Sequence, residues 1–320
     1  KSLEKMKKYI RGPWDECLKW IDDRLSEIWK LRGPYPGLGA CFTAMGVSLG
    51  TFVARALEQH FTENADIWPL VDAMFENPKD YLPSSLAKQV TPELSRMWKQ
   101  MPSERKELVK LLSRMELSNE QAKVVFVQSE RKKKGIHATD EEILKNPYIL
   151  YEQTRLQLEP IPIWTIDKAM FPNETLLETC PFLREGSFDS KYDIRRVRAL
   201  VVYVLEQAAN SGDTLLPFEE IVRQIRNLPI VPDCELHEDL LTSIETDLQQ
   251  EIIIVEMADG SKAYQLKRLY EMGQLIREKV EKRLKGTSIS ISADWRALLD
   301  EKLGGPIQIA DPYEAEKEEM

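Results

Sequence analysis

The sequence has few of the residues on which metal centres and disulfide frameworks depend. Its 320 residues include four cysteines and three histidines. Cys17, Cys41, Cys180 and Cys234 lie far apart and form no CxxC pair, so the pattern indicates neither a zinc site nor a disulfide framework. Reduced, mostly buried thiols in a cytoplasmic protein are the favoured interpretation.

Long apolar segments are missing as well. No run approaches the roughly 18 apolar residues that are needed to span a bilayer. The opening segment KSLEKMKKYIRG has no apolar centre of the kind found in signal peptides. The balance of 30% charged and 42% hydrophobic residues is typical of a folded globular protein. The sequence therefore predicts a cytoplasmic location and no membrane partner.

Common catalytic motifs are absent from the sequence. No Gly-Lys-Ser or Gly-Lys-Thr occurs, and Gly260-Ser261-Lys262 lacks the upstream glycine of a phosphate-binding loop. None of the histidines stands in an HExxH motif, and there is no GxSxG sequence. We expect this chain alone to be no enzyme and to hold no cofactor of its own.

Positive charge is concentrated in one part of an otherwise acidic chain. The net charge of -9 argues against a uniformly basic nucleic-acid-binding protein. Residues 96–134, in contrast, contain eleven lysines and arginines and five glutamates. This segment ends in Arg131-Lys132-Lys133-Lys134, the strongest electrostatic candidate for phosphate binding. A solvated helix end is the alternative interpretation of the same run.

Residues 1–135 are expected to form a helical region. Apolar residues recur every three or four positions up to Trp29, which predicts an amphipathic helix that Gly12-Pro13 divides. A segment rich in glycine and proline follows, and two short helices are expected around Gly46. A Gly37-x-Gly39 turn between helices would let backbone N–H groups approach a phosphate, as in a helix-hairpin-helix. The candidate DNA-binding residues here are Arg32, Gly37 and Gly39, and a tight helix connection without a ligand is the alternative.

Residues 136–186 are expected to form a second, irregular helical segment. Thr139 and Glu142 form a capping box that starts a helix, and Asn146-Pro147 interrupts it. Prolines recur from Pro160 to Pro181, and the linker-like residues 185–187 predict a domain boundary.

Residues 187–285 have the pattern of a winged helix. Helices are predicted over about 192–210, from Pro217 onward and over about 236–248, with Arg195, Arg196 and Arg198 largely beside the apolar stripe of the first. Residues 251–256 and 263–266 read as two strands around the turn Asp259-Gly260. The fold class expected for the whole chain is mainly α, a bundle of helical hairpins followed by a winged-helix domain with a small β-hairpin.

Two roles remain open for this winged helix. If it meets DNA, the residues expected near phosphates are Arg223, Arg226 and Lys262. Winged helices also dock proteins, and the acidic residues of this segment favour that role. Residues 286–320 are expected to be a linker toward a further domain.

The order of these motifs resembles a known family. Asn146-Pro147-Tyr148 is followed by Arg196-x-x-Ala199 and then by Gly212-x-Thr214-x-x-Pro217. This succession is similar to the region ahead of the motor in RecD-like superfamily 1 DNA helicases. Pro160 and Pro162 stand where the family's second hairpin has glycines, in the pattern that ends at Asp167. Because proline has no N–H, this departure removes two backbone donors, while the helical scaffold around it is expected to persist.

The resemblance implies a non-catalytic, DNA-engaging accessory region of an ATP-dependent helicase or helicase-like ATPase. The implied partners are single-stranded or forked DNA and the rest of the helicase polypeptide. ATP and Mg²⁺ are expected only in a motor that follows Met320. The alternative function is a protein-interaction scaffold that docks a partner or the motor.

Overall fold

The computed structural model describes residues 14–61, 65–286 and 292–303 of the chain. The chain divides into two compact units, residues 1–270 and 271–320. The predicted boundaries after residues 135 and 186 both fall inside the first unit. None of the described helices is long and apolar enough to cross a membrane. The predictions for residues 1–13 and for most of the 286–320 linker lie outside the described residues.

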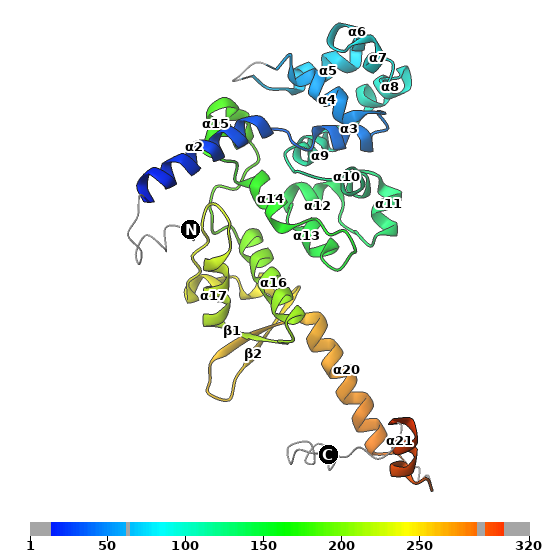
Figure 1. The fold of residues 1–320 in the computed structure, drawn as a ribbon, viewed down its shortest axis with the longest axis vertical. Coiled ribbons are helices and arrows are strands. Elements are labelled where there is room, and N and C mark those ends of the chain that lie inside the picture. Colours follow the sequence, from blue (N-terminus) through cyan, green and yellow to red (C-terminus); the bar gives the residue numbers. More distant parts are fainter. Residues whose placement is uncertain (1–13, 62–64, 287–291, 304–320) are drawn as a thin grey trace. The chain divides into compact units, whose positions relative to one another are not determined.

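The first part of unit 1 is entirely helical (Figure 1). Its helices are α2 (Trp14–Arg32), α3 (Leu38–Ala44), α4 (Gly50–Glu58), α5 (Trp68–Glu76), α6 (Pro78–Tyr81), α7 (Ser84–Ala87), α8 (Pro92–Gln100), α9 (Ser103–Ser113), α10 (Asn119–Phe126), α11 (Gln128–Lys133), α12 (Asp140–Lys145), α13 (Ile149–Thr154), α14 (Ile163–Met170), α15 (Glu174–Thr179) and the 3₁₀ helix η1 (Pro181–Arg184). The short helices α3 and α4 lie on either side of Gly46, as predicted.

Helix starts in this part follow from local side-chain chemistry. Thr139 Oγ1 accepts a hydrogen bond from the Glu142 N–H at 3.2 Å, and the Glu142 carboxylate accepts one from the Thr139 N–H at 2.7 Å. This is the capping box that the sequence predicts at the start of α12, and it satisfies two N–H groups that the helix leaves unpaired. The same arrangement, with Ser118 and Gln121, starts α10.

The rest of unit 1 combines helices with a small sheet. Its elements are α16 (Ile194–Asn210), β1 (Leu216–Pro217), α17 (Phe218–Asn227), α18 (Glu238–Ser243), α19 (Glu245–Leu248), β2 (Ile252–Glu256), β3 (Lys262–Leu266) and the start of α20 (Lys267–Leu284). The sheet has the order β1-β3-β2, and both pairings are antiparallel. The mainly helical fold class is confirmed, together with a small sheet.

Helix α16 is the central element of this part. It contacts α13 and α14 of the first part of unit 1, and also α17, α19 and β3 of its own part. Its apolar residues, from Val197 to Ala208, belong to one core that runs from Tyr35 to Leu266. Residues before and after the predicted boundary at 186 therefore share a single hydrophobic core.

Three arginines on α16 were expected beside the apolar stripe, and for two of them this was wrong. The Arg196 and Arg198 side chains are buried, and each forms a bidentate pair with a carboxylate of the preceding helices. Arg196 binds Asp167 of α14, and Arg198 binds Glu152 of α13. A buried charge needs such a partner, so these pairs join the two parts of the unit.

Unit 2 contains most of α20 and the helix α21 (Trp295–Leu303). No residue of α20 is buried, and its apolar residues Met272, Ile276 and Val280 are more than half exposed.

Candidate nucleic-acid interface

The basic run at residues 131–134 lies on α11 and just after it. This helix follows α10 after a single extended residue, Val127. Gly135, which follows the end of the helix, has a φ of +70°, in the left-handed region. The Gly135 N–H donates to the Lys132 carbonyl at 3.1 Å, and the Ile136 N–H donates to the Arg131 carbonyl at 3.0 Å. These two bonds are the Schellman motif, which explains the glycine and fixes the backbone of the run.

Arg131 does not contribute to the exposed surface. Its side chain is only 5% exposed, and Nε donates to the Val125 carbonyl at 2.8 Å while Nη1 donates to the Ala138 carbonyl at 3.1 Å. Nη2 also lies 2.7 Å from Asp140 Oδ1. Asp140 binds Arg105 as well, at 2.8 Å. Arg131 therefore holds α11 to its neighbours, and its burial leaves the predicted contact with phosphate without support.

Lys132, Lys133 and Lys134 are exposed, and Lys123 on α10 joins them. Lys133 Nζ lies 2.7 Å from Glu130 Oε1. A hydrogen bond and charge attraction from Lys133, followed by the charges of Lys123 and Lys134, hold the pKa of Glu130 below its usual value. One carboxylate is thus surrounded by several lysines. We call Lys123, Lys132, Lys133 and Lys134 the lysine patch.

Most other cations of residues 96–134 are engaged elsewhere. Arg105 pairs with Asp140, Lys106 with Asp72 and Lys110 with Glu107. Arg114 donates to the carbonyls of Ala169, Leu183 and Glu185. The positive excess of the sequence segment is therefore spread over several surfaces and internal contacts, and the lysine patch is a small part of it.

The Gly37-x-Gly39 turn is filled by protein rather than open to a ligand. The Gly37 N–H donates to the Ser113 carbonyl at 2.8 Å, so it is not available to a phosphate. A Cβ at Gly37 would lie 2.1 Å from the Met115 carbonyl oxygen, and one at Gly39 would lie 2.6 Å from Thr51 Cα. Both glycines thus allow close contacts between helices, which is the alternative that the sequence left open.

Arg32 lies at the end of α2, close to this turn. Its guanidinium is 4.9 Å from the centre of the Trp29 ring, and Nε is 3.4 Å from Glu116 Oε2. Burial lowers the pKa of Arg32, and the attraction of Glu116 opposes that effect. It lines a cavity of about 510 Å³ with Arg55, Glu58 and Glu116. Two carboxylates balance the two arginines, so the cavity has no strong positive potential.

The candidates of the later segment lie on separate elements. Arg223 and Arg226 are exposed on α17, and Lys262 is exposed on β3. Arg223 binds Glu220 at 2.5 Å, and Lys262 binds Glu245 at 2.5 Å. Among the described residues Arg226 has no ion-pair partner.

The surface around these residues is acidic. Residues 211–266 contain twelve aspartates and glutamates and three lysines and arginines. Because like charges repel, this segment offers a polyanion little attraction.

A buried polar cluster was not foreseen from the sequence. The Tyr148 hydroxyl donates to Asp167 Oδ1, and Arg196 donates to both Asp167 oxygens at 2.7 and 2.8 Å. Arg196 also donates to the carbonyls of Lys191 and Pro232. Burial, then the Asp167 charge, raise the pKa of Tyr148 well above its usual value, so Tyr148 stays a neutral donor. The one signal in the sequence that could have indicated this cluster is that Tyr148, Asp167 and Arg196 each belong to a family-like motif.

A second network joins the same two parts of unit 1. The Glu206 carboxylate on α16 accepts hydrogen bonds from Arg155 and Arg268, and Arg155 also binds Glu251 at 2.7 Å. Burial acts to raise the pKa of Glu206, but these two hydrogen bonds leave it below its usual value. Arg155 and Arg268 are thus connected through the buried carboxylate of Glu206.

Comparisons of this chain with protein-family models, with curated proteins and with solved structures found no match.

Proposed function

We propose that this chain is an accessory region of a RecD-like superfamily 1 helicase or helicase-like ATPase, and that the lysine patch contacts the DNA backbone. The observation that carries the proposal is the patch itself. Its four lysines are exposed, and three of them, Lys123, Lys133 and Lys134, lie close enough to Glu130 to lower its pKa. Arg131 and a Schellman motif hold the backbone of the run in place. Fixed positive charge of this kind binds phosphates without reading bases.

The placement of the family-like motifs supports the helicase part of the proposal. Tyr148 of the Asn-Pro-Tyr motif, Asp167 at the end of the second hairpin pattern and Arg196 of the R-x-x-A motif form one buried cluster. The order of α16, β1, α17, α18, α19, β2 and β3, with β1 paired to β3, is the order expected of a winged helix. ATP and Mg²⁺ would be bound by a motor in other residues of the same polypeptide.

Salt dependence of DNA binding tests the lysine patch. Anisotropy of labelled single-stranded and forked DNA would be measured for the wild type and for a variant with Lys123, Lys132, Lys133 and Lys134 changed to Gln. Four contacts with a single strand predict a slope of about -2.8 for log K against log salt, and so an affinity loss of about 50-fold between 50 and 200 mM salt. The variant should lose most of this slope.

A second quadruple variant provides the matched control. Lys19, Lys79 and Lys145 are exposed on other helices and Lys88 is exposed just after α7, and changing these four to Gln removes the same charge. We expect this variant to keep the wild-type slope. Equal slopes for all three proteins, or no binding by the wild type at low salt, would contradict the proposed interface.

A protein-docking role for residues 211–266 is the second candidate, and the acidic charge of that segment favours it. Arg223 and Lys262 are already neutralised by Glu220 and Glu245. The segment would contact a basic protein partner or the rest of its own polypeptide. A variant with Arg223, Arg226 and Lys262 changed to Gln should keep its DNA affinity if docking is its role, and should lose affinity if these residues contact phosphate.

A further inference from the structure

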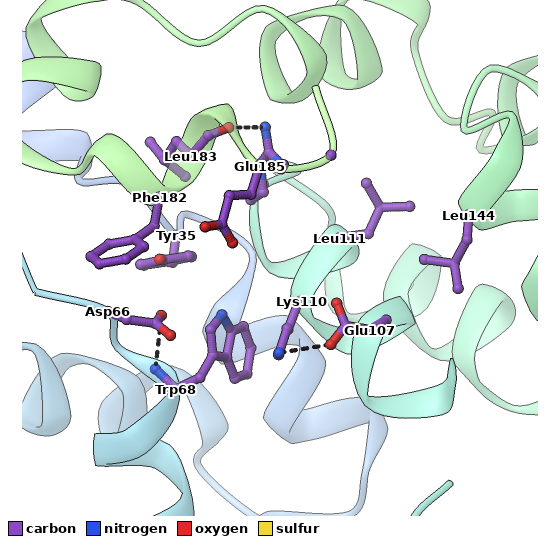
Figure 2. Close-up of a pocket in the computed structure, with 12 residues that line it drawn as sticks. Tyr35, Asp66, Trp68, Glu107, Lys110, Leu111, Leu144, Phe182, Leu183 and Glu185 are labelled. Carbon is purple, nitrogen blue, oxygen red and sulfur yellow. Dashed lines mark hydrogen bonds and ion pairs between the residues drawn. The ribbon is translucent and has the colours of Figure 1, made fainter. Parts of the chain in front are cut away.

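A hollow in unit 1 is lined by aromatic rings and carboxylates. It shares no residue with the lysine patch. It has a volume of about 170 Å³. Figure 2 shows Glu185 on one side, Asp66 and Trp68 opposite it, Tyr35 with Phe182 on a third side and Lys110 with Glu107 on the fourth. A dry cavity of about 150 Å³ is large enough for benzene, so the hollow fits a group of side-chain size.

Two aromatic rings form a rigid corner of the hollow. The Tyr35 and Trp68 rings have centroids 6.1 Å apart and planes at 80° to each other. Both residues are less than a tenth exposed, and the Tyr35 hydroxyl lies 3.7 Å from Cys180 Sγ. Phe182 is 40% exposed and stands at the rim. Ring faces attract cations, and they do so best where water is excluded.

The wall opposite Trp68 is held in place by Arg114. Its guanidinium donates to the carbonyls of Leu183 and Glu185, at 2.7 and 2.9 Å, and also to that of Ala169. Burial lowers the pKa of Arg114 because it disfavours the charged guanidinium. Hydrogen bonds to three carbonyls offset part of the cost of burying that charge. These bonds hold the backbone that carries Phe182 and Glu185 at the edge of the hollow.

The carboxylates of Asp66, Glu107 and Glu185 and the cations of Lys110 and Arg114 line the hollow, so negative charge exceeds positive charge by one. Lys110 Nζ lies 2.7 Å from Glu107 Oε1 and 5.9 Å from the centre of the Trp68 ring. The ammonium of Lys110 thus already sits between a carboxylate and an indole. The Asp66 carboxylate accepts a hydrogen bond from the backbone N–H of Trp68. Neither Asp66 nor Glu185 has an ion-pair partner in the described part of the chain. Across the described residues, no three acidic, histidine or cysteine side chains are grouped so as to hold a metal ion.

We propose that this hollow binds a small organic cation, an alkylammonium or guanidinium group of the kind that ends lysine and arginine side chains. The cation lies against the Tyr35–Trp68 corner, and Asp66 and Glu185 balance its charge. Weakly hydrated cations suit such a site because aromatic faces replace part of their hydration. The site is separate from the proposed DNA contact and does not depend on it.

Calorimetric titration of the full chain with charged and neutral ligands of the same shape tests the proposal. Choline would be compared with its neutral isostere 3,3-dimethylbutan-1-ol, and butylguanidinium with butylurea. We expect the cations to bind and the neutral molecules to bind at least about 10-fold more weakly. Spermidine and a blocked Gly-Arg-Gly peptide then distinguish a free amine from a protein side chain as the natural source.

Four single variants locate the binding. Asp66→Asn and Phe182→Ala should each weaken cation binding by about 2- to 30-fold. Glu178→Gln and Phe52→Ala change an exposed carboxylate and an exposed phenylalanine outside the hollow, and should leave it unchanged. Circular dichroism checks that each variant is folded, and Glu185→Gln replaces Asp66→Asn if the latter is not.

Three results would overturn the proposal. They are equal binding of choline and its neutral isostere, no binding of any cation at millimolar concentration, and wild-type affinity in the folded carboxylate variant, Asp66→Asn or Glu185→Gln. DNA affinity should be the same in all of these variants, so a failure here is separable from a failure of the lysine patch.

Discussion

Removing the Asp167 charge should be among the most damaging conservative changes in this protein. The side chains of Arg196 and Asp167 are 0% and 2% exposed, and two hydrogen bonds of 2.7 and 2.8 Å join them. In Asp167→Asn the Arg196 charge stays buried without a counter-charge. Loss of one partner of a buried ion pair costs about 3–5 kcal/mol, because the remaining charge is still desolvated. The carbonyls of Lys191 and Pro232 keep their bonds to Arg196, which places the expected cost toward the lower end.

Urea denaturation gives the free energy of unfolding for this test. Glu220→Gln is the matched control, since it breaks the exposed Arg223–Glu220 pair, and we expect no measurable change for it. Tyr148→Phe removes one hydrogen bond to the same carboxylate and should cost about 1.5–3 kcal/mol. A double variant, Asp167→Leu with Arg196→Met, should recover much of the loss because no charge is left buried. If Asp167→Asn is as stable as the control, the buried cluster is not formed as described.

Three further predictions concern packing, pH and thiol reactivity. Gly37→Ala should lower the melting temperature and cost at least about 1–3 kcal/mol, because its Cβ would lie 2.1 Å from a carbonyl oxygen; an unchanged melting temperature would show that the turn is open. The lowered pKa of Glu206 means that its stabilising effect is present above the unfolded-state pKa of about 4.5 and is lost as pH falls. The wild type should therefore lose stability between pH 5 and 3 more steeply than Glu206→Gln in urea titrations, and parallel curves would refute this. Burial raises the pKa of Cys41 to about 12 and that of Cys234 to about 11, so iodoacetamide should label the exposed Cys17 first, as read by mass spectrometry; faster labelling of either buried thiol would contradict it.

Periodicity located helices well where the apolar stripe was continuous. The helix predicted over about 192–210 is α16, Ile194–Asn210, and it ends where the sequence has Ser211-Gly212. The single helix predicted over about 236–248 is instead two, α18 and α19, separated at Ile244. Leu241, Ile244 and Leu248 are all buried and keep a spacing of three and four. The apolar pattern is the same with or without the break, so it could not reveal it.

The buried ion pairs that the sequence could not predict join residues that lie far apart in the chain. Asp167 and Arg196 are 29 residues apart, and Glu152 and Arg198 are 46 apart. A local pattern assigns charged residues to the surface, because nothing nearby shows that a counter-charge will be buried with them. Residues on both sides of the predicted boundary near residue 186 belong to unit 1, and these pairs join them.

The candidate DNA interface, too, could be predicted from the sequence only in part. The basic run was visible in the sequence, but Lys123 reaches it only because α10 and α11 are joined by one extended residue. The Gly37-x-Gly39 sequence fitted either a phosphate site or a tight helix connection, and the end of α9 fills the turn. Neither relation can be read from spacing alone.

Arginine and lysine take different positions in this protein, and the difference changes how its charge should be read. Arg114, Arg131 and Arg196 each bind several carbonyls or carboxylates in the interior, which the five donors of a planar guanidinium allow. An ammonium has three donors on a strongly hydrated charge and is poorly suited to those places. The cations left at the proposed interface are lysines. Net charge counted over both residue types therefore overstates the charge available to DNA, and changes of the buried arginines would alter DNA affinity only through the stability of the fold.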